Sequence, residues 1–217
     1  MYGVLLRRWS RGGMINICYN EPMKTEIEVK FLAVDHDDIR AKLTAIGATL
    51  EIPMRLMRRV TIDNDLMGKK EAFVRIRDEG HKVTMTYKQF DELSVDGAKE
   101  IEVEVSNFQD AIDLLDAAGL KHTSYQETRR ETWKLGSTEI VLDEWPWIKP
   151  YIEIEGESEA ALRDVAAQLG LDWADGVFGD VMVAYRAEYP HLGERETVGN
   201  VAEVLFGAEL PELLRTR

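Results

Sequence analysis

Three stretches of the chain alternate charged and apolar residues, and each is followed by the pattern of an amphipathic helix. They are residues 26–30, 101–105 and 152–155, each with a Glu-x-Glu core. Successive side chains of a β-strand point to opposite faces, so each stretch predicts a strand with one charged and one apolar face. Each helical pattern ends at a glycine, namely Gly47, Gly119 or Gly170. The repetition predicts equivalent positions for the three strands in one architecture.

The predicted helices have recognisable first residues. Asp35, Ser106 and Ser158 stand immediately before them, and such side chains accept hydrogen bonds from the amides of the first helical turn. Ser106 with Gln109 three residues later has the pattern of a capping box. A further helix is predicted over residues 181–188. The first three helices are amphipathic and are expected to cover the apolar faces of the strands.

A second set of strands carries basic side chains. Residues 72–77 put Arg75 and Arg77 on one face, and residues 82–88 return as a hairpin partner that carries Lys88. Residues 55–62, 130–135 and 139–143 bring the set to about eight strands. If the sheet closes with helices outside, the charged faces point at one another. The sequence therefore predicts an α+β fold: a closed eight-stranded antiparallel β-barrel, or tunnel, with a charged lumen and helices packed outside.

One domain accounts for most of the chain. A length of 217 residues suits one large domain or two small ones, and the strand and helix patterns run over residues 23–190. Residues 1–22 have no sustained periodicity and predict a disordered extension. Residues 191–217 predict a short helical tail, with Pro211 opening a final turn.

Composition excludes several classes of protein. The net charge of −13 argues against a general nucleic-acid binder, which needs a basic face for phosphates. With Cys18 as the one cysteine, neither an intrachain disulfide nor a thiolate metal cluster can form. No apolar run approaches the ~20 residues of a membrane span, so a cytoplasmic protein is expected. The four histidines fall at helix starts or in loops and are expected at the surface: His36, His81, His122 and His191.

Acids and bases of these types in one lumen point to a polyanionic ligand. Arginine grips phosphate with two parallel donors, and lysine adds a compact charge. Carboxylates alone would repel a polyphosphate, so divalent cations are expected between the acids and the phosphates. Mg²⁺ and Mn²⁺ prefer oxygen ligands, which matches glutamate pairs without a histidine or cysteine cluster.

Residues 26–30, Glu-Ile-Glu-Val-Lys, match the Glu-x-Glu-x-Lys motif of the CYTH superfamily, the triphosphate tunnel metalloenzymes. From about residue 23 to 189 the chain resembles this family, with the other charged motifs in the family's order. The resemblance implies a triphosphate bound by Lys30, Arg75, Arg77, Lys88 and Arg130. It implies metal ligation by Glu26, Glu28, Glu153 and Glu155, with Asp143 nearby, and catalysis by Glu28, Lys30 and Lys88. On the second acidic strand we expect Glu102 and Glu104, rather than Glu100, in the lumen.

The chain departs from the family pattern at Thr128 and at residues 148–151, where Ile-Lys-Pro-Tyr stands in place of the Leu-Gly-x-Phe that often leads into the acidic strand. Thr128 stands where many relatives have a lysine, and Arg129 would point to the opposite face. The expected protein is a Mg²⁺- or Mn²⁺-dependent triphosphate hydrolase, a monomer or homodimer without nucleic-acid or membrane partners. Two alternatives stay open: a class IV adenylyl cyclase that forms cyclic AMP and pyrophosphate, and a non-catalytic polyphosphate-binding module. Arg75 and Arg77 could also merely pair with Glu102 and Glu104 in a structural charge lattice.

Overall fold

The structure is a computed structural model that describes residues 23–91 and 94–215, so the predicted extension at 1–22 lies outside the described residues. Its strands are β1 (Lys24–Glu26), β2 (Glu28–Leu32), β3 (Thr49–Ile62), β4 (Ala72–Asp78), β5 (Val83–Phe90), β6 (Ala98–Val105), β7 (Ser124–Leu135), β8 (Thr138–Glu144), β9 (Tyr151–Glu155) and β10 (Glu203–Val204). Its α-helices are α1 (His36–Ala45), α2 (Asp65–Gly68), α3 (Phe108–Ala117), α4 (Glu159–Gln168) and α5 (Met182–Glu188). In the described ranges, no helix is long and apolar enough to cross a membrane.

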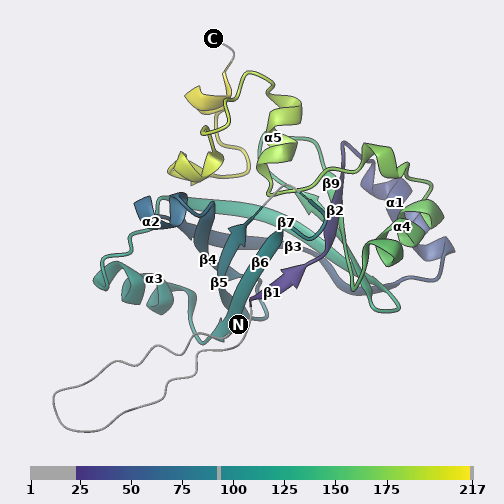
Figure 1. Cartoon of the computed structure of the whole chain (residues 1–217), viewed down its shortest axis with the longest axis horizontal. Helices are drawn as coiled ribbons and strands as arrows, with labels where there is room; N and C mark the ends of the chain where they lie inside the picture. The colour runs from purple at the N-terminus through teal and green to yellow at the C-terminus, as the bar shows by residue number, and fades with distance from the viewer. Residues whose placement is uncertain (1–22, 92–93, 216–217) are drawn as a thin grey trace, which may run out of the picture.

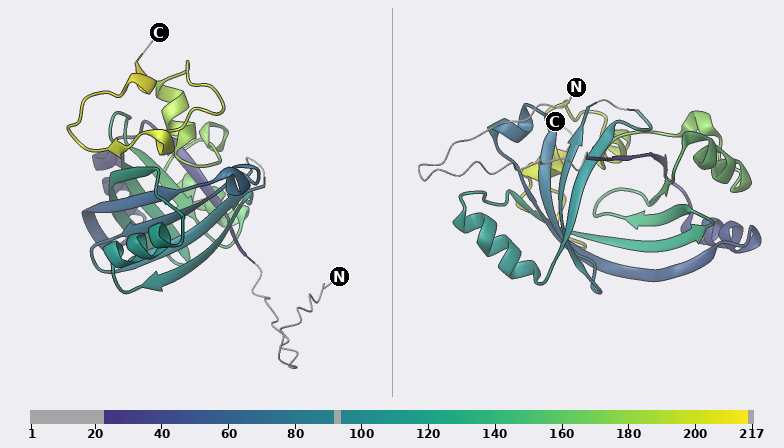
Figure 2. Two further views of the ribbon diagram at one scale, coloured as in Figure 1. Left: turned by 90° about the vertical axis from the view of Figure 1, so that its left-hand side faces the viewer. Right: turned by 60° about the horizontal axis from the view of Figure 1, so that its bottom comes forward.

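Nine strands form an antiparallel sheet that curls into a nearly closed barrel (Figures 1 and 2). Along the sheet the order is β1-β6-β5-β4-β3-β7-β8-β9-β2. β1 and β2 are two halves of one extended segment, interrupted at Ile27. The first half pairs with β6 and the second with β9, so this segment joins the two edges of the sheet. Counted as one strand, it makes the barrel eight-stranded, which confirms the predicted fold.

The longest strand, β3, lies between β4 and β7 and runs the length of the barrel wall. Its register against β7 shifts between Leu50 and Ile52 and again between Ile52 and Arg55. Pro53 lies inside this irregular stretch and has no amide hydrogen to donate to a neighbouring strand. Beyond it, pairing is regular from Arg55 to Thr61. Alternate residues of this regular stretch therefore face the lumen.

The hydrophobic core lies outside the barrel, between the strands' outer faces and the helices. Helices α1 and α4 lie side by side over β2, β8 and β9 and bury Leu43 and Leu162 fully (Figure 1). Helix α3 packs on β3 and β4 through Ile112, and α5 packs on Trp145 and Tyr151. Burying one such side chain contributes about 1.5–3 kcal/mol. Apolar packing outside thus leaves the interior free for charged groups.

The helix starts follow the sequence patterns with one correction. Asp35 accepts hydrogen bonds from the amides of residues 37 and 38, and Ser158 accepts one from that of Ala161, as predicted. Helix α3 begins one residue later than the capping-box pattern implies, because Asn107, not Ser106, bonds the first turn through the amide of Asp110. Either residue type can cap a helix, so local sequence alone does not choose between these neighbours.

His36 corrects the expectation of four surface histidines. It is the first residue of α1 and is buried, with Nε2 3.1 Å from the carbonyl oxygen of Tyr151. A carbonyl only accepts, so Nε2 carries the hydrogen and donates. The other three histidines, His81, His122 and His191, are exposed as expected.

The predicted C-terminal tail begins at residue 191, after α5. Its described part, residues 191–215, contains the 3-10 helices η2 (Val198–Asn200) and η3 (Glu212–Leu214), the latter starting after Pro211. Between them lies the strand β10, which pairs in parallel with β7. Val198, Val204 and Leu214 are buried against Trp145 and Tyr151. This packing makes the segment one side of the tunnel wall (Figure 1).

Candidate functional site

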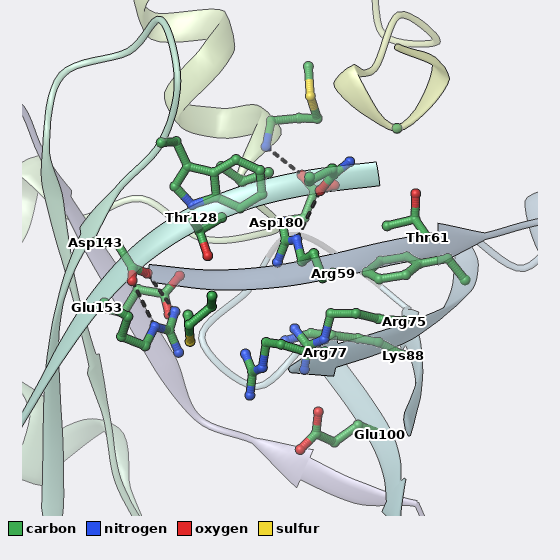
Figure 3. A pocket seen from close by; sticks show the side chains of 18 of the residues that line it. Arg59, Thr61, Arg75, Arg77, Lys88, Glu100, Thr128, Asp143, Glu153 and Asp180 are labelled. Atoms are coloured by element: carbon green, nitrogen blue, oxygen red, sulfur yellow. Dashed lines mark hydrogen bonds and ion pairs between the residues drawn. The ribbon is translucent and has the colours of Figure 1, made fainter. Parts of the chain in front are cut away.

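The barrel encloses a cavity of about 1220 Å³ that is lined by charged side chains of both signs (Figure 3). All ten side chains predicted to bind triphosphate or metal line it: Glu26, Glu28, Lys30, Arg75, Arg77, Lys88, Arg130, Asp143, Glu153 and Glu155. They come from β1, β2, β4, β5, β7, β8 and β9. Period-two alternation on seven strands thus directs them all into one space, as the sequence pattern predicts.

Lys30 is the centre of the acidic side of the cavity. Glu28 and Glu155 are opposite each other on β2 and β9, as are Lys30 and Glu153. The Nζ of Lys30 lies 2.9 Å from Glu28 Oε1 and 3.3 Å from Glu153 Oε1, and its side chain is only 3% exposed. Burial alone would lower the pKa of Lys30, but the carboxylates of Glu153 and Glu28 raise it well above its usual value. Lys30 is therefore a fixed cation that holds the two acids in place.

Arg130 on β7 makes a second fixed cluster. Its Nε donates to Asp143 at 2.7 Å, and its Nη2 donates to Glu153 at 2.8 Å. Asp143 is 1% exposed, so its charge depends on this partner. Arginine's rigid fork suits such paired contacts with a carboxylate, and the same fork suits a phosphate.

The basic side of the cavity holds two arginines that sequence analysis missed, Arg55 and Arg59 on β3. Glu79, from the β4–β5 turn, lies 3.2 Å from Arg55 and 2.6 Å from Arg77. Burial would raise the pKa of Glu79, but Arg77 lowers it to about 2. The alternation over residues 55–61 was the signal that could have identified Arg55 and Arg59. In this region arginines outnumber their carboxylate partners.

The second acidic strand corrects one expectation. Glu100, ranked lowest from the sequence, lines the cavity with Glu102, whereas Glu104 is exposed at the far end of β6 and does not line it. All three share one face of the strand, but the strand leaves the lumen before it reaches residue 104. Lys88 of β5 is opposite Glu100 and contacts Glu26. Burial and the charge of Glu26 raise the pKa of Glu100 to about 7.

Arg129 points away from the cavity, as the alternation along the strand predicts. Thr128 lines the cavity, while Arg129 is exposed on the outer face, 3.2 Å from Glu144 and 4.3 Å from the ring centre of Phe206. Arg129 therefore does not replace the lysine of many relatives. At this level the cavity wall carries the hydroxyl of Thr128.

The family model of the CYTH domain matches residues 24–177, which include all ten predicted site residues. The chain belongs to the CYTH domain family. The match ends before α5, so the C-terminal part of the cavity wall, with Asp180 and Met182, lies beyond the matched residues.

Solved structures support this CYTH fold. A protein from Pyrococcus horikoshii has a TM-score of 0.61 and 26% identity, over 70% of this chain and 93% of that one. A proposed adenylate cyclase from Vibrio parahaemolyticus has a TM-score of 0.64 and 14% identity, over 75% of this chain and 98% of that one. At that identity the second likeness shows the fold alone. A comparison with curated proteins finds no match.

CYTH enzymes of the triphosphate tunnel type use divalent metals, and the acids of this chain fit such an ion in donor type. They offer only carboxylate oxygens, which Mg²⁺ and Mn²⁺ prefer. Within the described residues no three acidic, histidine or cysteine side chains are already arranged around a metal position. The carboxylates instead contact Lys30 and Lys88. A divalent cation would have to take over some of these contacts, and it would relieve the crowding of negative charge.

Two raised pKa values predict how the stability of this CYTH protein without metal depends on pH. Burial and nearby glutamates raise the pKa of Glu100 and of Glu155 from the usual 4.5 to about 7. Between these values the folded protein binds more protons than the unfolded chain, so its free energy of unfolding should fall as pH rises from about 5 to about 8. Urea unfolding in EDTA at several pH values measures this slope.

Glu100→Gln removes one of the two groups and should make that slope shallower. Glu104→Gln is the matched control, because Glu104 lies on the same strand outside the cavity, and it should keep the wild-type slope. An unchanged slope in Glu100→Gln would contradict the assignment of the raised pKa to this site.

Proposed function

We propose that this CYTH protein is a divalent-metal-dependent hydrolase of a triphosphate held in the tunnel. The observation that carries the proposal is the division of the cavity into two sides. One side gathers Arg55, Arg59, Arg75 and Arg77 with two carboxylate partners, Glu79 and Glu102, and the other gathers glutamates of β1, β2 and β9. Arginines that outnumber their carboxylate partners are stabilised by a bound anion, and glutamates next to that anion are stabilised by a bound cation.

Different residues of the cavity would bind the phosphates and orient the metal ligands. Arg75, Arg77 and Arg130 would bind phosphate oxygens through their guanidinium forks, and Lys88 would add a point charge. Lys30 would keep Glu28 and Glu153 oriented for the cation. A divalent metal, when bound, supplies charge neutralisation and acidifies the attacking water. Phosphoryl transfer needs mainly positioning and charge stabilisation, so a rigid barrel with fixed charges suits it.

Two other functions use the same cavity. Cyclisation of ATP by an adenylyl cyclase would use the same phosphate grip with a ribose hydroxyl as nucleophile. We favour hydrolysis because no stretch of the sequence reads as an adenine-specific pocket. A silent binding module would be expected to have lost part of the acid set, whereas Glu26, Glu28, Glu153 and Glu155 are all present and line the cavity.

Incubation with three substrates tests the proposal. Tripolyphosphate, thiamine triphosphate and ATP are each supplied with Mg²⁺ or Mn²⁺, and the products are separated by ion-exchange chromatography. Hydrolysis predicts free phosphate and the matching diphosphate, and EDTA should abolish the release until excess metal is added. Cyclic AMP and pyrophosphate from ATP would establish the alternative instead. Full turnover in EDTA would refute the metal dependence.

A further inference from the structure

Strand β6 has a backbone edge that is paired on one side over its whole length and on the other side over less than half. Towards β5 the pairing runs from Ala98 to Val105. Towards β1 it stops at Glu100, which is opposite Lys24. Within residues 23–91 and 94–215, no strand pairs with residues 101–105 on this second side, and no other backbone hydrogen bond reaches them. Unpaired N–H and C=O groups in a row form a template to which another chain can add a strand.

The outer face of the same five residues is apolar and exposed to solvent. Ile101 is 51% exposed and Val103 is 46% exposed, because α1 and α4 lie over β2, β8 and β9 instead (Figure 1). The apolar surface continues into a hollow of about 310 Å³ beside α3, lined among others by Met85, Val105 and Leu114. Exposed apolar surface next to an unpaired strand edge is typical of an interaction site.

The other face of the strand carries glutamates, and the fold shows what such a position accepts on both sides. Glu100 is opposite Lys88 of β5 and opposite Lys24 of β1. Glu102 and Glu104 are opposite threonines of β5, and among the described strands none lies on their other side. Opposite charges at directly opposed positions stabilise a strand pair. A strand with lysine or arginine at these two positions would therefore repeat the arrangement of Lys24 and Glu100.

A second copy of the chain does not meet this requirement. Directly opposed residues of two paired strands lie on the same face of the sheet. If β6 paired with β6 of a second copy and kept the two apolar faces together, glutamate would be opposite glutamate, and like charges in these positions destabilise the pair. The residues that precede β1 in the chain do not supply a cation either, since residues 20–22 are Asn-Glu-Pro. The acids thus disfavour self-association through this edge and favour a basic partner.

We propose that the open edge of β6 binds an extended segment of a partner protein in which basic and apolar residues alternate. The backbone of this segment adds a strand beside residues 101–105. Its basic side chains face Glu102 and Glu104, and its apolar side chains cover Ile101 and Val103. Main-chain hydrogen bonds supply much of the affinity in this mode of recognition, and the alternate side chains supply the specificity. The site is separate from the triphosphate chemistry, so it does not rest on the proposed hydrolysis.

A labelled peptide of eight residues, Lys-Val-Lys-Val-Lys-Val-Lys-Val, tests this inference with the full chain. Fluorescence anisotropy is measured in about 0.15 M salt, which screens the long-range attraction of any cation to this acidic protein. The alternating peptide should bind with a Kd below about 1 mM. A control peptide with four lysines followed by four valines has the same composition and charge. It should bind at least about tenfold more weakly, because it cannot place charges on one face and apolar groups on the other.

Hydrogen–deuterium exchange locates the binding site. The alternating peptide should slow the exchange of the amides in residues 101–105, because an added strand accepts hydrogen bonds from those that are now unpaired. Binding through charge alone leaves this exchange unchanged. Protection already present in the full chain without peptide would show that the edge is occupied by the chain itself, or by a second copy if the protection increases with protein concentration.

Two variants test the two faces of the edge separately. Glu104→Lys reverses a charge outside the cavity and should weaken binding of the alternating peptide at least about tenfold, equivalent to about 1.4 kcal/mol. Glu203→Lys makes the same change at an exposed residue of β10 and should leave the affinity unchanged. The double variant Ile101→Thr/Val103→Thr keeps β-branched residues in the strand but removes apolar contact, and it should weaken binding by a similar factor. It also tests the site if Glu104→Lys does not fold.

Three outcomes would overturn the inference: a wild type that does not bind the alternating peptide, equal affinity for the alternating and the control peptide, or protection of residues 101–105 in the full chain without peptide. Glu104→Lys should leave triphosphate turnover unchanged, since Glu104 does not line the cavity. Loss of peptide binding and loss of hydrolysis are therefore distinguishable results.

Discussion

Glu28→Gln is expected to lower metal-dependent turnover of a triphosphate at least about 100-fold, the loss typical of removing one strong electrostatic contributor at an active site. Glu28 is buried between two lysines, 2.9 Å from the Nζ of Lys30 and 3.9 Å from that of Lys88. The amide keeps the size of the side chain but removes the negative charge. The divalent cation would lose a ligand, and Lys30 would lose one of its two carboxylate partners.

The measurement is kcat/KM as a function of Mn²⁺ concentration. If Glu28 binds the metal, the variant should need more Mn²⁺ to reach its own maximum. Glu104→Gln makes the same chemical change at a glutamate outside the cavity and should behave like the wild type. Wild-type turnover in Glu28→Gln would show that Glu28 is not needed for catalysis, and it would count against metal binding by the glutamates of the acidic side.

The residues that line the lumen could be predicted because each strand carries its own alternation of charged and apolar side chains. Period-two alternation of charged and apolar residues places side chains on opposite faces of any strand, and the residue types report which face needs a ligand. All ten predicted binding residues accordingly line one cavity. Closure of the sheet through the interrupted segment at Ile27 was implied only in part, because it depends on β6 and β9, which lie far away in the sequence.

The positions that were predicted wrongly or missed are decided by contacts between distant parts of the chain. Glu104 shares the alternation of Glu100 and Glu102, but only the path of β6 decides where the strand leaves the lumen. The burial of His36 follows from a hydrogen bond to Tyr151 on β9. β10 consists of two residues that pair with β7, which is too short for any periodic signal. In each case the deciding contact is made by a distant part of the chain.

Arg130→Gln is expected to have two separate effects. The free energy of unfolding of the protein without ligand should fall by about 3–5 kcal/mol, because buried Asp143 loses its charged partner. Affinity for tripolyphosphate, measured in EDTA, should also fall, by about 2–5 kcal/mol, if Arg130 grips phosphate. Arg129→Gln, the next residue on β7 but exposed, should change neither quantity by more than about 1 kcal/mol.

A double variant distinguishes phosphate binding by Arg130 from a purely structural role in balancing the charge of Asp143. In Arg130→Gln/Asp143→Asn the buried carboxylate is gone as well, and Glu153 keeps Lys30 as its partner. Stability should therefore return most of the way to that of the wild type, since a neutral pair leaves no buried charge without a partner. Affinity should stay low, because the guanidinium is still missing. If the double variant instead binds tripolyphosphate like the wild type, Arg130 serves only to balance Asp143, and the phosphate grip must be built from the β3 and β4 arginines alone.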